Sequence, residues 1–200
     1  NSGVRRDRGP AEPEPVRPAF RYREMQGDVQ QAELVFGWRT PGVAHDDTPA
    51  LDLLATVLSA GRASRLYRAV RERRLASSVT AFNYTPDELG VFVVHAAATA
   101  ERSRAASNAV WDEVRRAREG EITEVEVERA RCVLEAQWLR RLETMEGQAS
   151  HLASWELLGD WRAGTLYLER LLGTGAEQLA EVASRYLTPE RAGLVAYLPA

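Results

Sequence analysis

Lysine is absent from this sequence of 200 residues, and all 26 basic residues are arginine. That absence excludes chemistry that needs a lysine amine, such as Schiff-base catalysis or a P-loop nucleotide site. The sequence holds one cysteine, Cys132, which excludes an internal disulfide and a zinc site built from several cysteines. No apolar run approaches the roughly 18 residues of a membrane-spanning helix, so we expect no membrane span.

The overall charge is close to balanced, with a formal net charge of −3. This value predicts no general attraction for the phosphates of nucleic acid. Apolar residues make up 44% and charged residues 28% of the chain, which is typical of a globular protein. We therefore expect a soluble bacterial protein without a nucleic-acid partner, and leave the cytoplasm and the periplasm both open.

Proline is concentrated at the start of the chain, where four of the nine prolines fall within residues 1–19. Proline removes backbone donors and favours extended structure, so this stretch cannot build a core. We predict an inter-domain linker at residues 1–19 and one folded domain over residues 20–200.

Hydrophobic periodicity divides the folded part into strands and helices. Apolar residues alternate over 31–39, which is typical of a half-buried strand, and residues 91–98 are apolar throughout. Thr123 and Glu126 have the spacing of a capping box, which predicts the start of a helix. Strands joined by a hairpin and grouped helices favour an α+β fold with a mainly antiparallel sheet. The predicted strands are 20–25, 31–39, 76–84, 91–98 and 192–198. Apolar helical stripes run over 50–58, 106–117 and 127–142, and further helices are predicted at 64–74, 146–158, 164–172 and 176–187.

Three segments together resemble a known family. They are HDDTPALDLLATVLSAGRASRLYRAVRER (45–73), LASSVTAFNYTPDELGVFVVHAAA (75–98) and LAEVASRYLTPERAGLVAYLPA (179–200). In this order they resemble the second, non-catalytic domain of the pitrilysin/insulinase family of zinc metallopeptidases, which includes mitochondrial processing peptidase. The resemblance implies a single domain with an antiparallel sheet flanked by helices on one side.

The resemblance also implies a partner. In this family a separate catalytic domain or subunit carries the zinc motif H-x-x-E-H, and the two halves form a chamber for extended or unfolded peptides. This sequence has no such motif, because His45, His95 and His151 each lack a second histidine one helical turn away. We therefore expect no metal in this chain, zinc in the absent catalytic domain, and no peptide hydrolysis by this chain alone.

Two positions match residues that contact substrate in active members of the family. An arginine there is followed shortly by a tyrosine, and the resemblance places the arginine at Arg71 and the tyrosine position at Ser77. The phenol that could polarise a carbonyl is therefore lost. The glycine that usually precedes the Leu75-Ala76 pair is also absent. Arg71 could equally be a solvated or salt-bridged residue at a helix end.

The phrase Gly61-Arg-Ala-Ser64-Arg65-Leu-Tyr is the more specific part of the resemblance. Gly61 is expected to permit a tight turn between two helices, with Ser64 and Arg65 in the same turn. Three functions stay open at this point. The chain could close a peptide chamber, it could be a catalytically dead scaffold or inactive partner subunit, or it could be an unrelated α+β enzyme with a site assembled from remote residues.

Overall fold

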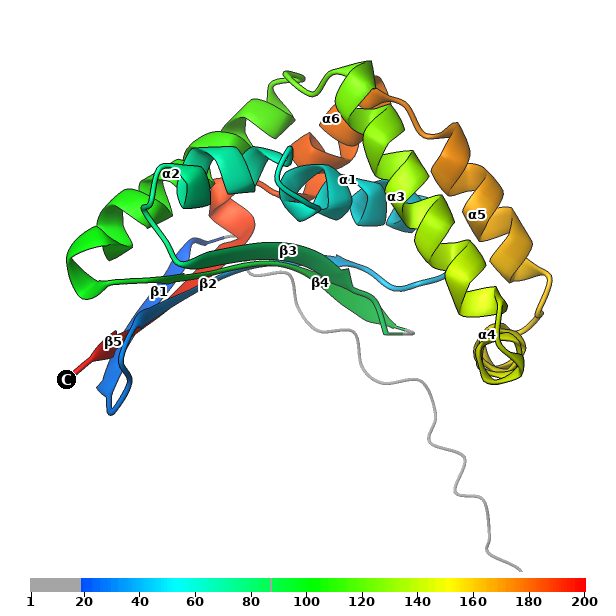
Figure 1. The fold of residues 1–200 in the computed structure, drawn as a ribbon, viewed down its shortest axis with the longest axis horizontal. Coiled ribbons are helices and arrows are strands. Elements are labelled where there is room, and N and C mark those ends of the chain that lie inside the picture. The colour runs from blue at the N-terminus through cyan, green and yellow to red at the C-terminus, as the bar shows by residue number, and fades with distance from the viewer. Residues whose placement is uncertain (1–18, 87) are drawn as a thin grey trace, which may run out of the picture.

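A five-stranded sheet forms one layer of the structure, and the helices form a second layer over one of its faces (Figure 1). The computed structural model describes residues 19–86 and 88–200. The predicted linker at 1–19 lies almost wholly outside these residues and stays a prediction. The strands are Arg21–Gly27 (β1), Ala32–Pro41 (β2), Ser78–Tyr84 (β3), Leu89–Ala98 (β4) and Ala192–Pro199 (β5).

The helices lie close to their predicted positions. They are Thr48–Ser59 (α1), Ala100–Arg118 (α2), Glu124–Leu142 (α3), Met145–Leu157 (α4), Ala163–Gly173 (α5) and Ala176–Tyr186 (α6), with a π-helical turn Tyr67–Glu72 (η1) and a 3-10 turn Pro189–Arg191 (η2). None of the helices within the described ranges is long and apolar enough to cross a membrane.

The order of the strands in the sheet is β1-β5-β2-β4-β3. Strand β2 pairs antiparallel with both β4 and β5, and β3 and β4 form an antiparallel hairpin. The last strand, β5, lies between the first two and pairs parallel with β1. The prediction of an α+β fold with a mainly antiparallel sheet is confirmed, and β1–β5 is the one parallel pair.

The core lies between the sheet and the helices. Alternation in β2 turns Leu34, Phe36 and Trp38 toward the helices, where all three are buried. The Trp111 ring of α2 meets the rings of Phe36 and Trp38 edge-on, with centroids 5.5 and 5.6 Å apart. The Trp38 indole N–H donates to the Thr188 carbonyl at 3.1 Å, so the buried donor is satisfied.

Two helix starts show how local sequence sets these elements. At α3, the Glu126 carboxylate accepts from the Thr123 backbone N–H at 2.9 Å and the Thr123 hydroxyl faces the Glu126 N–H, which confirms the capping box. The helix predicted at 64–74 is helical from Arg65 but winds as a π-helix, and the Leu75 N–H donates to the Val70 carbonyl at 2.8 Å. Apolar spacing cannot distinguish this winding from an α-helix.

We predict that Gly90→Ala destabilises the fold. A methyl group at Gly90 would lie 2.5 Å from the Pro41 carbonyl oxygen and 2.6 Å from the Thr40 hydroxyl, so β2 and β4 would have to separate. Overpacking of this kind costs about 1–3 kcal/mol, measurable by chemical denaturation. Gly173→Ala is the matched control, because nothing lies within 4 Å of its added methyl group. Equal unfolding free energies for the two variants would contradict this description of the β2–β4 contact.

Candidate functional site

The segment from Gly61 to Ser77 joins α1 to β3 and carries all of the site residues expected from sequence. Gly61 has a φ of +76°, in the left-handed region that favours glycine, and turns the chain directly after α1. The Ser64 side chain is buried, and its hydroxyl donates to the Gly61 carbonyl at 2.7 Å. This bond closes the turn and starts the helical residues that follow.

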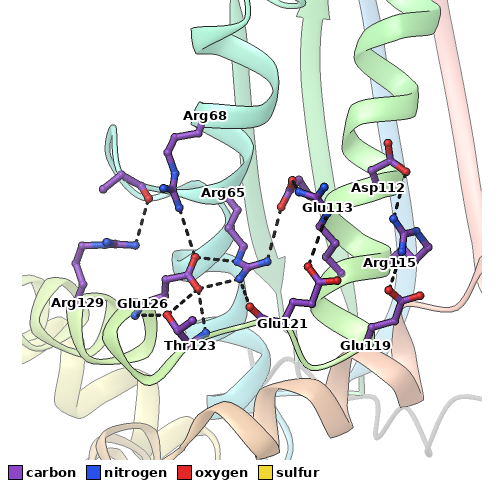
Figure 2. A network of polar contacts seen from close by, with 12 residues as sticks. Arg65, Arg68, Asp112, Glu113, Arg115, Glu119, Glu121, Thr123, Glu126 and Arg129 are labelled. Carbon is purple, nitrogen blue, oxygen red and sulfur yellow. Dashed lines mark hydrogen bonds and ion pairs between the residues drawn. The ribbon is translucent and has the colours of Figure 1, made fainter.

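Arg65 ties this segment to α3. Its Nε and Nη2 atoms donate to the two carboxylate oxygens of Glu126 at 2.9 and 2.8 Å, which is a bidentate pair (Figure 2). Nη2 also donates to the Glu121 backbone carbonyl, and Nη1 lies 3.8 Å from Glu113. We call these four residues the Arg65 network. The Arg65 and Glu126 side chains are only 10% and 9% exposed, so the charges are largely removed from water.

The ionisation of Glu126 reflects these bonds. Burial alone would raise the pKa of Glu126, but the hydrogen bonds from Arg65 and Thr123 outweigh it and lower the pKa from 4.5 to about 2. The carboxylate is therefore charged at every physiological pH. Its folded-state pKa lies below the unfolded value, so this stabilisation is complete above about pH 4.5 and is lost as the pH falls toward 2.

Arg71 and Ser77, the two expected substrate-contacting positions, line one pocket of about 430 Å³. We call it the Arg71 pocket. The Arg71 guanidinium lies over the Tyr67 ring, 5.8 Å from its centroid. The Ser77 hydroxyl is 2.8 Å from Gln31 Oε1 and 3.0 Å from the Ala97 carbonyl oxygen. The full lining is Gln31, Arg71, Arg74, Leu75, Ala76, Ser77, Thr99 and Arg102.

Arg74 has an unusual backbone. Its φ is +57°, and it is the one non-glycine residue with a positive φ among those described. Its peptide N–H donates to the Arg71 carbonyl at 2.9 Å, and its own carbonyl accepts from Arg102 Nη1. The sequence showed that a glycine was missing before Leu75. The structure shows that the backbone at this position keeps the conformation that glycine adopts most easily.

Sequence reasoning missed several members of the site. Glu126 was identified as a capping residue but not as the partner of Arg65, and Gln31, Thr99 and Arg102 were not singled out. Gln31, Thr99 and Arg102 lie 28 to 40 positions from Arg71, and Glu126 lies 61 positions from Arg65, so no local spacing relates them. Only the positions of Arg71 and Ser77 carried a signal, through the family resemblance.

The described residues do not fit a zinc site. In residues 19–86 and 88–200 no three His, Cys, Asp or Glu side chains gather closely enough to hold a metal ion. Each histidine has a separate environment. His45 Nδ1 accepts from the Asp47 backbone N–H, His95 Nε2 lies 2.6 Å from Glu33, and His151 packs against Trp138. His95 is therefore a hydrogen-bonded residue of β4.

Comparison with known proteins decides the family. The profile of the family described as peptidase M16 inactive domain matches residues 3–134. This chain belongs to that family. Zinc protease PqqE of Helicobacter pylori is 26% identical over 176 residues, which cover 86% of this chain and 40% of that protein.

Solved structures of the M16 family share this fold. A protease from Helicobacter pylori superposes with a TM-score of 0.87 at 25% identity, over 96% of this chain and 47% of that one. The inactive peptidase domain of a Bordetella parapertussis protein superposes with a TM-score of 0.78 at 22% identity, over 88% and 97% of the two chains. The chain thus spans less than half of the two Helicobacter proteins, while the Bordetella domain matches it along nearly all of its length.

Breaking the Arg65–Glu126 pair should destabilise the M16 domain in a pH-dependent way. We expect Glu126→Gln to lower the free energy of unfolding at pH 7 by on the order of 3 kcal/mol, because the depressed pKa of Glu126 represents stabilisation of that size. The difference from the unmodified chain should shrink as the pH falls from 4.5 toward 2. Denaturant titrations across this pH range measure both effects.

Glu119→Gln is the control for that experiment. Glu119 pairs with Arg115 at 2.7 Å, but both side chains are 50% exposed, so its loss should cost less than about 1 kcal/mol. A Glu126→Gln effect as small as that of Glu119→Gln would contradict the importance given to the buried pair.

The strained backbone at Arg74 predicts that one substitution there stabilises the fold. Arg74→Gly should raise the free energy of unfolding by about 1 kcal/mol, because glycine adopts a positive φ without steric cost. Arg73→Gly removes the same charge from the neighbouring residue, whose φ is −77°, and should lower stability by about 0.5–1 kcal/mol. Thermal or chemical unfolding compares the two, and destabilisation by both would rule out strain at Arg74.

Proposed function

We propose that this chain is the non-catalytic half of a zinc metalloendopeptidase, which closes a peptide chamber over a separate catalytic domain or subunit and helps to bind extended peptide. The observation that carries this proposal is the Arg71 pocket, because it brings together the two positions that the resemblance relates to substrate contact. Zinc would be held by the partner, since the described part of this chain offers no site for it.

Family membership and the greater length of a relative support the existence of a catalytic partner. Zinc protease PqqE extends well beyond the matched region, and this chain covers 40% of it. The remaining length is sufficient for at least one more domain of this size. The proposed catalytic half is therefore either another part of the same protein or a separate subunit.

Helix α4 supports contact with another polypeptide. None of its residues is buried, and Met145 and Leu157 are 82% and 88% exposed. Leu152 of the same helix and Trp161, which follows the helix, add further apolar surface around an open pocket of about 510 Å³. A helix of a soluble domain usually buries one apolar face, and exposed apolar patches of this kind mark interaction surfaces. We infer that the catalytic half covers part of this surface.

A second function, that of a scaffold without substrate contact, is favoured by one observation. Ser77 replaces the expected tyrosine, and its short side chain bonds to Gln31 and Ala97 of the same chain. It therefore cannot reach a substrate carbonyl as a tyrosine would. Under this alternative the chain would bind the catalytic half and leave peptide binding to it.

Reconstitution tests the proposed function and separates it from the alternative. The chain is added to the accompanying catalytic domain, produced separately, and cleavage of an unstructured peptide is followed with zinc and with a chelator. We expect zinc-dependent cleavage to rise with the concentration of this chain. No gain in cleavage would refute the proposal.

The variant Arg71→Gln should lower that cleavage about tenfold or more while the complex still forms, because a charge-assisted hydrogen bond to substrate is lost. Arg73→Gln is the control, since Arg73 does not line the Arg71 pocket. Unchanged cleavage by the Arg71→Gln complex would favour the scaffold.

A further inference from the structure

The η1 segment presents arginines to two pockets that differ in charge balance. The pocket around Arg65 has a volume of about 390 Å³, and its lining includes Arg65, Arg68, Arg73 and Arg116 together with Glu113, Glu121 and Glu126. Arg65, Arg68 and Arg116 form ion pairs with these carboxylates, and Figure 2 shows those of Arg65 and Arg68. The Arg71 pocket holds three guanidinium groups, and no acidic side chain is among the described residues that line it.

Two carboxylates flank the pocket arginines in the sequence, Glu72 beside Arg71 and Glu101 beside Arg102, and neither lines the pocket. Glu101 lies in the first turn of α2, next to Arg102, and does not line the Arg71 pocket. Hydrogen bonds from its own backbone N–H and from the Thr99 hydroxyl lower the pKa of Glu101, so its carboxylate is already engaged at the helix start. Three guanidinium groups and no carboxylate among the described lining residues leave the pocket positive.

The other polar groups are arranged to add donors to this pocket. The Ser77 hydroxyl bonds to Gln31 Oε1, which leaves the Gln31 amide nitrogen as a donor. Arg102 donates to the Arg74 carbonyl, and the Arg71 guanidinium lies over the Tyr67 ring, so each has a contact that restrains it. Fixed guanidinium groups lose little side-chain entropy when a ligand binds.

Arg74 gives an independent indication. It occupies a left-handed backbone position that a glycine would fill without strain, and a strained residue of this kind is often associated with a functional site. Its side chain adds the third positive charge to the pocket. Arginine is conformationally unfavourable at this position, but it contributes a positive charge to the pocket.

We propose that the Arg71 pocket binds the carboxylate of a peptide, supplied either by a free C-terminus or by an aspartate or glutamate side chain. A guanidinium group pairs with a carboxylate through two parallel hydrogen bonds. A volume of about 430 Å³ is near the lower end for ligand pockets and suits one or two residues of an extended peptide. The inference rests on the proposed function for the identity of the ligand as a peptide.

Equilibrium binding to the 200-residue chain tests the inference with four dye-labelled, unstructured peptides of one sequence. The first has a free C-terminal carboxylate and the second a C-terminal amide. The third and fourth are amides with one internal glutamate or glutamine. We expect a carboxylate to strengthen binding about tenfold or more, and the four peptides show whether the C-terminus or the side chain supplies it.

Two variants connect the effect to this pocket. Arg102→Gln and Arg74→Gly should reduce binding of the carboxylate peptides to the level of their neutral counterparts. Arg74→Gly removes the charge without imposing backbone strain, so misfolding cannot explain its effect. Arg73→Gln is the matched control, because it removes the same charge from the adjacent residue and should leave the discrimination unchanged.

The outcomes are separable from those of the reconstitution experiment. Equal binding of charged and neutral peptides, or discrimination that survives both variants, overturns the carboxylate pocket and leaves the role in the peptide chamber intact. Failure of all four peptides to bind also overturns this inference. The proposed closing role would then be judged by whether the chain still stimulates cleavage.

Discussion

The bidentate pair between Arg65 and Glu126 is the interaction on which the site depends. Both side chains are nearly buried, so each charge is acceptable only while the other is present. Glu126 also caps α3, and Arg65 also binds the carbonyl of Glu121 in the loop between α2 and α3. One pair of side chains therefore connects the residues just before η1, the α2–α3 loop and the first turn of α3. Removing either partner would leave a largely buried charge with only a longer ion pair, from Arg65 to Glu113 at 3.8 Å or from Glu126 to Arg68 at 3.7 Å.

The Arg65–Glu126 pair explains how the segment from Gly61 to Ser77 can both stabilise the fold and present a candidate binding site. Arg65 and Arg68 turn toward carboxylates and hold the segment in place. Arg71 and Arg74 turn to the other pocket, where the described residues provide no acidic lining. Because the segment from Gly61 to Ser77 is held by Arg65 near its start and leads directly into β3, the second pair of arginines lies on a supported backbone. The guanidinium groups of Arg71, Arg74 and Arg102 are the charged groups that a ligand would meet among the described residues of this pocket.

Much of the fold could be predicted from the sequence, because the signals were local. Alternation in β2, the capping box at Thr123 and the apolar stripes of the helices each depend on neighbours within a few residues. The position of β5 between β1 and β2 had no local signal, since it depends on pairing between the two ends of the domain. Periodicity likewise placed a helix near Arg71 without revealing its π-helical winding.

The site was less predictable, because its residues are far apart in the sequence and meet only in the folded chain. Arg71 and Ser77 could be chosen through the family resemblance, but 26 arginines offer no sequence pattern that shows which ones converge. Arg102 reaches the Arg71 pocket from α2, and Gln31 reaches it from the residue before β2. The sequence shows only that arginine stands where the family usually has glycine before Leu75. The structure shows that Arg74 has the left-handed φ that such a glycine would adopt.

Hydrogen exchange in an Arg65→Gln variant tests most directly whether this pair holds the site segment. The amides of Arg74 and Leu75 donate to the carbonyls of Arg71 and Val70, so they report on the winding of η1. The account predicts that both amides lose protection in the variant, while amides in the β2–β4 pairing keep theirs. Unchanged protection at Arg74 and Leu75 in a folded Arg65→Gln chain would contradict it.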